Sequence, residues 1–324
     1  MTVLAGDVGA TTSRLGLVRG DDARPEIRER AEFASGEFPG LSAVVRRYLD
    51  GLPTRPDRAV LAVAAPVLGG RARFANLDWE VDRGELARDT GIDRVHLLND
   101  FEAVCHALPL LEADDVVEVV SGTPDPAGTV AVLGAGSGLG HAFLTRGEGE
   151  VRVHSSEAGH ADFAPRTRTQ DALLRWLRER YGRGSWERVV SGPGLVDVYR
   201  FLLETGRCAE EPETRDRLGP EDAAAVVSER GLEGSDSACR RALEVFGEVY
   251  GAQAGNFALA VQATGGVYLG GGISPKILPV LRGEGFREAF RDKGKLASMM
   301  EAVPVRVITD PDAGLLGAAR VALG

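Results

Sequence analysis

The chain has 324 residues, 44% of them hydrophobic and 27% charged, which is enough for about two domains with full hydrophobic cores. Its formal net charge of −10 argues against a nucleic-acid-binding protein, because such proteins present a concentrated basic face. Three widely separated cysteines, Cys105, Cys208 and Cys239, give no zinc-ligand spacing and fit a reducing cytoplasm. We see no signal-peptide pattern and no apolar run near the ~18 residues of a membrane span, so we expect no membrane association.

The first third of the chain alternates short apolar runs with helical patterns. The predicted elements, in chain order, are a strand at Val3–Ala5, a turn from Gly6 to Thr12, a strand at Arg14–Arg19, a helix over 41–49, strands at Ala59–Ala65 and Val95–Leu98, and a helix at Phe101–Leu108. The first strand, turn and returning strand predict a hairpin at the N-terminus. Asn99 and Asp100 stand where the last of these strands gives way to its helix.

The rest of the chain repeats the strand–turn–strand layout and then becomes mostly helical. The predicted elements are a surface loop at Ser121–Gly128, a strand at Val130–Leu133, a turn at Gly134–Gly140, a strand at His141–Leu144, helices over 171–181, Val196–Leu203, Ala223–Ser228 (with Pro220 in its first turn) and Asp236–Ala260, and strands at Val267–Leu269 and Val305–Ile308. Strands that alternate with helices indicate an α/β fold, and the second hairpin predicts an internal repeat. We expect a smaller domain of residues 1–110 plus 303–324 and a larger domain of residues 111–302.

Three glycine clusters each follow an apolar strand, at Gly6–Thr12, Gly134–Gly140 and Gly265–Gly272. Glycine lets backbone amides approach phosphate oxygens and adopts positive φ, so the clusters indicate either nucleotide-binding turns or ordinary tight turns. None of them matches the GxxxxGK[ST] of a Walker loop or the GxGxxG of a Rossmann fold. The HRD and DFG motifs of protein kinases are missing as well.

The glycine clusters are part of an ordered set of motifs that spans nearly the whole chain. In order, these are Gly6-Asp7-Val8-Gly9-Ala10-Thr11-Thr12-Ser13-Arg14, Asn99-Asp100-Phe101, Gly134-Ala135-Gly136-Ser137-Gly138-Leu139-Gly140, Glu157-Ala158-Gly159-His160-Ala161-Asp162-Phe163-Ala164-Pro165, Glu187-Arg188-Val189-Val190-Ser191-Gly192-Pro193-Gly194-Leu195, Gly265-Gly266-Val267 with Gly270–Ile273, and Gly314-Leu315-Leu316-Gly317. The set resembles the bacterial glucokinase family, which belongs to the actin-like, hexokinase-like ATPase superfamily. One such turn would be weak evidence, whereas the ordered set is specific.

The resemblance implies an α/β fold of two actin-like, ribonuclease H-like domains, with mixed sheets flanked by helices and a cleft between the domains. It implies a cytoplasmic enzyme that phosphorylates glucose to glucose 6-phosphate with ATP and Mg²⁺, and whose domains close over the sugar to exclude water. Glucose and ATP are then its partners. Similar enzymes often form dimers, so a homodimer is one expected assembly.

The resemblance also assigns site residues position by position. Asp100 is the expected general base that takes the proton of the attacking sugar hydroxyl. The expected sugar-binding residues are Asn99, Asp100, Glu157, His160 and Glu187. The expected nucleotide-binding residues are Gly6, Asp7, Val8, Gly9, Ala10, Thr11, Gly136, Ser137, Gly138, Gly271 and Gly272. Asp7 is expected to hold Mg²⁺ through water, and the Gly265–Gly272 region is expected to face the adenosine.

Two residues depart from the first turn of the family, which reads GD-[IV]-GGTN-x-R. Ala10 replaces its second glycine, and Thr12 replaces its asparagine. Alanine is costly at position 10 if that residue requires positive φ, and weaker ATP binding would follow. Without the resemblance, Asn99 or Asp100 would simply cap the following helix, and Glu157 and Glu187 would be surface carboxylates.

Three other functions fit parts of the sequence. A kinase for mannose, fructose or an amino sugar would use the same residues. A sugar-responsive transcription regulator of the related group would carry an N-terminal helix-turn-helix, for which the turn at Gly6 leaves no room, and a Cys-rich zinc loop, which the sequence lacks. A sugar-binding pseudokinase would explain Ala10 and Thr12.

Overall fold

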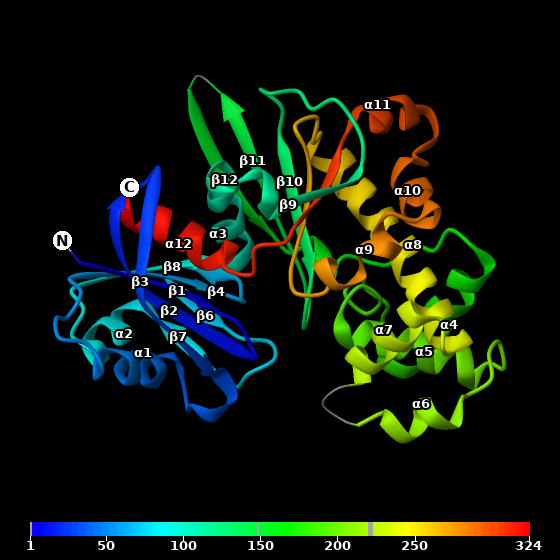
Figure 1. Ribbon diagram of the computed structural model, residues 1–324, viewed down its shortest axis with the longest axis horizontal. Helices are drawn as coiled ribbons and strands as arrows, with labels where there is room; N and C mark the ends of the chain where they lie inside the picture. Colours follow the sequence, from blue (N-terminus) through cyan, green and yellow to red (C-terminus); the bar gives the residue numbers. More distant parts are fainter. Residues whose placement is uncertain (1, 148, 220–222) are drawn as a thin grey trace.

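The computed structural model describes residues 2–147, 149–219 and 223–324. They fold into two halves that lie side by side, each built on a mixed β-sheet with flanking helices (Figure 1). Within these ranges, no helix has the length and apolar character needed to cross a bilayer. Pro220, expected in a first helical turn, lies outside the described residues, and the helix that follows is described from Ala223.

The first half contains eight strands and three α-helices among the described residues. They are β1 (Val3–Val8), β2 (Thr12–Asp21), β3 (Arg24–Ala34), α1 (Leu41–Leu49), β4 (Arg58–Val63), β5 (Val67–Leu68), β6 (Arg71–Arg73), β7 (Glu80–Asp82), α2 (Arg83–Thr90), β8 (Arg94–Asn99) and α3 (Asp100–Ala107), with 3₁₀ helices η1 (Ser35–Glu37), η2 (Leu108–Leu110) and η3 (Ala113–Asp115). The second half continues from η3, and a last helix returns to the first.

The elements of the second half are also given in chain order. They are β9 (Val116–Val120), β10 (Val130–Ala135), β11 (Leu139–Gly147), β12 (Glu150–Ser156), η4 (Ala158–His160), α4 (Arg168–Tyr181), α5 (Gly192–Glu204), α6 (Pro212–Arg217), α7 (Ala223–Glu233), α8 (Ser237–Val261), β13 (Gly266–Gly270), η5 (Ser274–Ile277), α9 (Leu278–Leu281), α10 (Glu284–Arg291), η6 (Gly294–Leu296), α11 (Ala297–Ala302) and β14 (Val305–Ile308). The returning helix is α12 (Ala313–Leu323).

The two large sheets share one plan, which confirms the internal repeat. The first sheet has the order β3-β2-β1-β4-β8, and the second has the order β12-β11-β10-β13-β14-β9. In each, the strand before a glycine turn pairs antiparallel with the strand after it and parallel with a later strand. These inner strands are buried almost throughout, so they read as unbroken apolar runs rather than as alternating patterns.

Two helices each follow a strand of one sheet and pack against the other sheet. Helix α3 follows the last strand of the first sheet and packs against β10, β11 and β12 of the second, while α12 follows β14 and packs against β1, β2 and β4 of the first. The two helices also cross each other closely, because Gly317 of α12 lies directly over the backbone of Ala103 in α3. The chain thus connects the halves twice, at α3 and at residues 309–312, beside the crossing.

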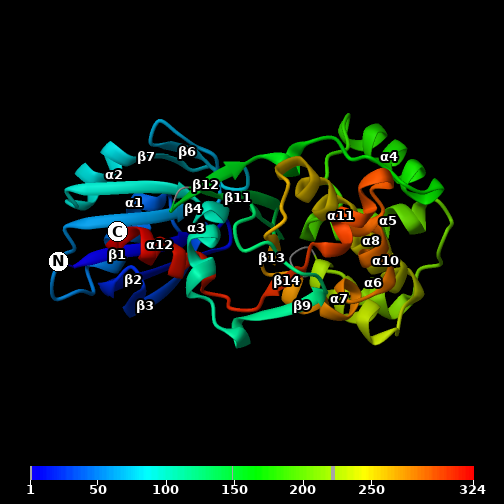
Figure 2. The ribbon, with the colours of Figure 1, turned by 90° about the horizontal axis from the view of Figure 1, so that it is seen from above.

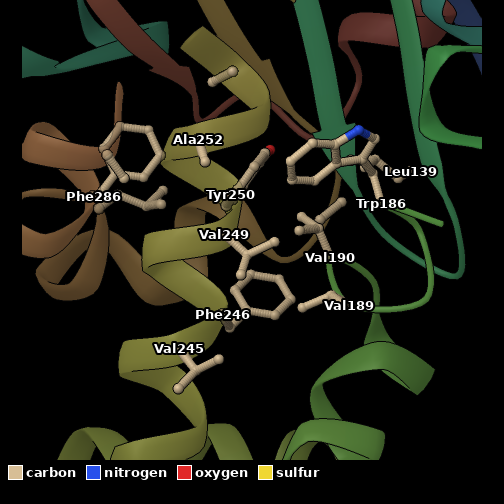
Figure 3. Packing of buried hydrophobic residues seen from close by; sticks show 14 of the residues in the cluster. Leu139, Trp186, Val189, Val190, Val245, Phe246, Val249, Tyr250, Ala252 and Phe286 are labelled. Carbon is tan, nitrogen blue, oxygen red and sulfur yellow. The ribbon is translucent and has the colours of Figure 1, made fainter. Parts of the chain in front are cut away.

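The larger hydrophobic core lies in the second half, around the long helix α8. Figure 3 shows Phe246 and Val249 of α8 facing Val189 and Val190, with Trp186 above them. The other side of the helix packs against α10, where the rings of Tyr250 and Phe286 meet edge to face at 6.1 Å. This core reaches up to the turn at the start of β11 and supports one wall of the cleft described below.

The structure differs from the sequence expectations at the ends of strands and in whole elements that were not expected, among them β9, α2 and α12. The first turn is shorter than expected, since β1 runs on to Val8, and β10 likewise runs to Ala135. Strands β3, β12 and the small sheet β5-β6-β7 were not expected, because their residues are largely polar and exposed. Strand β14 pairs in the second sheet, so the element that returns to the first half is α12. The domain division at residues 110 and 303 remains a proposal.

Candidate active site

A cavity of about 250 Å³ lies between the two halves, at the carboxyl ends of the inner strands. From above, the two halves lie side by side, with α3 where they meet (Figure 2). Carboxyl ends of parallel strands are the usual place for ligand sites in open α/β sheets. The cavity is lined by Gly9, Ala10, Ala64, Ala65, Pro66, Phe74, Ala75, Asn76, Asn99, Asp100, Phe101, Gly134, Gly136, Ser137, Gly138, Leu139, Gly140, His141, Ser156, Glu157, His160, Glu187 and Gly271.

Asn99 and Asp100 occupy the junction between β8 and α3, and the two side chains have different contacts. Asn99 is the N-cap, whose side-chain oxygen accepts hydrogen bonds from the backbone amides of Phe101 at 3.0 Å and Glu102 at 3.3 Å. The Asn99 amide nitrogen donates to the carbonyl of Ala65 at 3.4 Å. Because Asn99 caps the helix, the carboxylate of Asp100 is left beside the cavity, where it accepts one hydrogen bond from the Phe101 amide at 3.0 Å.

The opposite wall carries Glu157, His160 and Glu187, which the structure brings together. The ring of His160 lies between the two carboxylates, with its Nε2 3.8 Å from Glu157 and its Nδ1 3.7 Å from Glu187. Glu187 is held in place by the backbone amide of Leu139, which donates to its Oε2 at 3.0 Å. Burial, followed by the neighbouring charge of Glu187, raises the pKa of Glu157, although His160 opposes this. These groups can both donate and accept hydrogen bonds to several hydroxyls at once.

Two carboxylates on the first half have strongly raised pKa values. Burial raises the pKa of Asp100 to about 7, and the negative charges of Asp7 and Glu157 add to the effect. Burial likewise raises the pKa of Asp7 to about 6, helped by Asp312 and opposed by Arg14. A carboxylate poised near neutral pH in a cleft is suited to act as a general base.

The first glycine turn accepts alanine at position 10 without backbone strain. Among the described residues, Glu29 and Gln262 are the only non-glycine residues with positive φ, so Ala10 does not need a left-handed conformation. The turn is closed by a hydrogen bond from the Gly9 amide to the Thr12 carbonyl at 2.9 Å. The hydroxyl of Ser35 donates to the Gly9 carbonyl at 2.8 Å and supports it from behind. The backbone strain that alanine would cause at a positive φ therefore does not arise at Ala10.

A second, larger cavity of about 830 Å³ adjoins the first at the second glycine turn. Gly136 and Ser137 line both cavities. The rest of the second cavity is formed by Tyr181, Arg188, Gly192, Pro193, Leu195, Val196, Asp197, Arg200, Ala223, Ala224, Ala225, Ser228, Glu229, Leu232, Ile273 and Lys276. Its lining combines apolar residues with the cationic side chains of Arg188, Arg200 and Lys276 and the carboxylates of Asp197 and Glu229. The guanidinium of Arg188 lies over the Tyr181 ring at 4.2 Å.

Sequence reasoning missed most of this second cavity. Its apolar lining on α5 and α7 has the ordinary pattern of helices packed in a core, so no local signal separates wall from core. The available signals were the motif that begins at Glu187, which contains Arg188 and Gly192, and the motif Gly270–Ile273, which ends at Ile273 of the lining. Phe74 and Asn76 were likewise missed, because nothing in the loop 74–79, between β6 and β7, marks it as part of a cleft.

Some expected nucleotide-binding residues are not brought to either cavity. Gly6 and Val8 are buried within β1, where an added side chain at Gly6 would collide with Leu15 and Leu61. Thr11 and Gly272 are exposed but line neither cavity, whereas Gly271 lines the first. Of the Gly265–Gly272 region, which was expected to face the adenosine, Gly271 alone lines either cavity. Gly265 precedes β13 and packs on Gly128, at the far end of the strand from Gly271.

Comparison with known proteins decides the family. The glucokinase family model matches residues 4–324. The chain belongs to the glucokinase family. A glucokinase of Synechocystis sp. is 38% identical over 341 residues, which cover 98% of this chain and 96% of that protein.

Solved structures of the glucokinase family share the fold. The glucokinase of an Antarctic psychrotroph is 32% identical, with a TM-score of 0.82 over 99% of this chain and 98% of that one. A ROK family glucokinase from Streptomyces griseus, in complex with glucose and AMPPNP, is 21% identical with a TM-score of 0.68 over 99% of both chains. The predicted class, two actin-like domains with mixed sheets, is thereby confirmed.

Proposed function

We propose that this member of the glucokinase family transfers the terminal phosphoryl group of ATP to glucose, with Asp100 as general base. The observation that carries the proposal is the position of Asp100, at the cleft and opposite Glu157, His160 and Glu187. The glycine turn at Gly136 and Ser137 lies between this cavity and the second one. An acceptor hydroxyl at Asp100 and phosphates at the turn would thus be in line for transfer.

The polar wall supports a sugar as the acceptor. A hexose offers several hydroxyls, and a site that pairs each of them rejects an analogue that leaves a buried group unpaired. Glu157, His160 and Glu187 supply such groups on one side, and Asn99 and Asp100 on the other. Glucose is the hexose that the names of the curated relatives indicate.

The second cavity supports ATP as the donor. Its apolar walls suit a nucleobase, and backbone amides at the glycine turn suit phosphate oxygens. Lys276 and Arg188 line it and would attract the negative charge of the triphosphate. The Streptomyces griseus relative, whose structure holds the ATP analogue AMPPNP, has the same fold.

Magnesium is the metal that the family implies, and the carboxylates fit it. The charge of Asp7 raises the pKa of Asp100, and the charge of Asp312 raises the pKa of Asp7, so a divalent cation beside these carboxylates would relieve the repulsion among them. Mg²⁺ keeps most of its waters and takes one or two carboxylates together with phosphates, which suits Asp7. When bound, it would neutralise charge on the phosphates. Asp100 then remains free to accept the proton of the sugar hydroxyl.

A coupled assay with ATP and a panel of hexoses tests the proposed function. We expect turnover with glucose at a kcat/KM well above that for mannose, fructose or an amino sugar. A preference for another of these sugars would overturn glucose as the substrate. Sugar binding without any turnover would instead indicate a pseudokinase.

We also propose a cytoplasmic compartment and a homodimeric assembly. Cys105, Cys208 and Cys239 are all free thiols, which supports a reducing cytoplasm. A homodimer remains an expectation drawn from the family. Sedimentation of the purified chain would test it.

A further inference from the structure

Glu157, His160 and Glu187 form one wall of the cleft, here called the sugar wall. A pair of buried polar side chains lies next to the segments that carry this wall and has no part in the mechanism above. His141 of β11 is 1% exposed, and Gln253 of α8 is 3% exposed. His141 also lines the first cavity, and the ring of Phe257 meets its imidazole edge to face at 4.7 Å. Buried polar groups need hydrogen-bond partners, since an unpaired one costs about 1–3 kcal/mol.

The partners of His141 fix the direction of each hydrogen bond. Its Nδ1 lies 3.3 Å from the carbonyl oxygen of Leu139, which can only accept, so Nδ1 carries the hydrogen. Burial lowers the pKa of His141 to about 4, so the ring is neutral and Nε2 is an acceptor. The amide nitrogen of Gln253 lies 3.1 Å from Nε2 and donates to it. The same nitrogen donates its second hydrogen to the carbonyl of Ala158 at 3.5 Å.

This chain of hydrogen bonds ends on the backbone beside all three polar residues of the sugar wall. Ala158 follows Glu157 and begins η4, the single turn that ends at His160. Leu139, at the other end, donates its amide to Glu187 at 3.0 Å. The two ends also touch, because an added side chain at Gly159 would collide with the Leu139 carbonyl. Helix α8 is thereby tied through two side chains to the segments that carry the sugar-binding groups.

We propose that His141 and Gln253 are positioning residues, which hold the Glu157–His160 turn and the Leu139 amide at the spacing that a hexose requires. The inference rests on the proposed function. It concerns the wall opposite Asp100, and neither residue contacts the base or lines the nucleotide cavity. Loss of the pair should therefore lower the affinity for the sugar and leave the rate of the chemical step and the affinity for ATP largely unchanged.

The test is the kinetics of Gln253→Met, which keeps the size of the side chain and removes both hydrogen bonds. We expect KM and Kd for glucose to rise about tenfold, the effect of about one lost hydrogen bond, with kcat and KM for ATP nearly unchanged. Gln170→Met is the matched control. Gln170 is equally buried in α4, and it also makes two hydrogen bonds, to Arg166 and Glu248, but it lines neither the cleft nor the nucleotide cavity.

A second pair of variants separates positioning from general stability. His141→Leu removes the acceptor for Gln253 and should raise KM for glucose as Gln253→Met does. His141→Gln places an amide oxygen near the former Nε2, so it should recover most of the lost affinity. Should the apolar variants fail to fold, His141→Gln and Gln253→Asn provide the same comparison between a kept and a lost contact.

The outcomes distinguish the inference from the function on which it rests. Wild-type turnover of glucose, with KM and Kd unchanged in Gln253→Met and His141→Leu, would overturn the positioning role alone. The positioning role would also be overturned if Gln170→Met raised KM for glucose as much as Gln253→Met does. A wild-type chain that neither binds nor phosphorylates any hexose would overturn both proposals.

Discussion

At the scale of single residues, one carboxylate that lines the cleft, Asp100, and one that does not line it, Asp7, are harder to ionise in the folded protein. Asp7 and Asp100 have pKa values raised to about 6 and about 7, mainly by burial, and each is further raised by a neighbouring carboxylate. A group whose pKa is higher in the folded state stabilises the fold at low pH, and this contribution is lost as the pH rises through that value. Ionisation of Asp7 and Asp100 therefore lowers the stability of the folded state at neutral pH.

Replacing Asp7 with asparagine should relieve this cost. We expect Asp7→Asn to raise the melting temperature at pH 8, where the wild-type carboxylate is ionised, by on the order of a few degrees. The gain should vanish near pH 4, below the folded pKa, because both side chains are then neutral. Thermal unfolding of both proteins across this range measures the effect.

The exposed residue Asp114 supplies the control for this prediction, since Asp114→Asn should change the melting temperature little at either pH. An equal gain for Asp7→Asn at pH 4 and pH 8 would contradict the account, because steric or packing effects would not depend on pH in this way.

At the scale of elements, the crossing of α3 and α12 determines how the two halves meet. Helix α12 carries two glycines at its contacts: Gly314 lies against the carboxylate of Asp7, and Gly317 against the backbone of Ala103. The first contact places the start of α12 beside Asp7, at the end of β1 that leads into the first glycine turn. The second contact allows α3 and α12 to cross closely, so that each packs against the sheet of the other half.

Gly317→Ala tests the crossing, because two effects there have opposite signs. Helix propensity alone would stabilise α12 by about 1 kcal/mol. The added methyl group, however, would collide with the Ala103 carbonyl, and overpacking of this kind typically costs about 1–3 kcal/mol or more. We expect the collision to outweigh the propensity, so the melting temperature should fall.

Gly285→Ala in α10 is the matched control, since an added methyl group there meets only the flexible Glu248 side chain at 3.3 Å. It should be neutral or slightly stabilising. A rise in the melting temperature of Gly317→Ala equal to that of the control would show that the helices are not in close contact at this point.

At the scale of the whole molecule, the sequence predicted the two hairpins and the α/β class because buried inner strands are unbroken apolar runs that end in glycine. It could not predict β3 or β12, whose polar, exposed residues give no such signal. Nor could it find His141 and Gln253, because the hydrogen bonds that join them connect residues 112 positions apart. The family motifs supplied the expected site residues, and the fold explains why they meet: each half brings one wall to a shared cleft.

The central claim is that a base on the first half acts on a sugar held by the second, and Asp100→Asn tests it most directly. Asparagine keeps the shape of the side chain and its contact with the Phe101 amide but cannot accept the proton at neutral pH. The account predicts glucose binding close to wild type in calorimetry, with kcat reduced by about 10²–10⁴-fold in the coupled ATP assay. Near-full turnover of glucose by Asp100→Asn would contradict it.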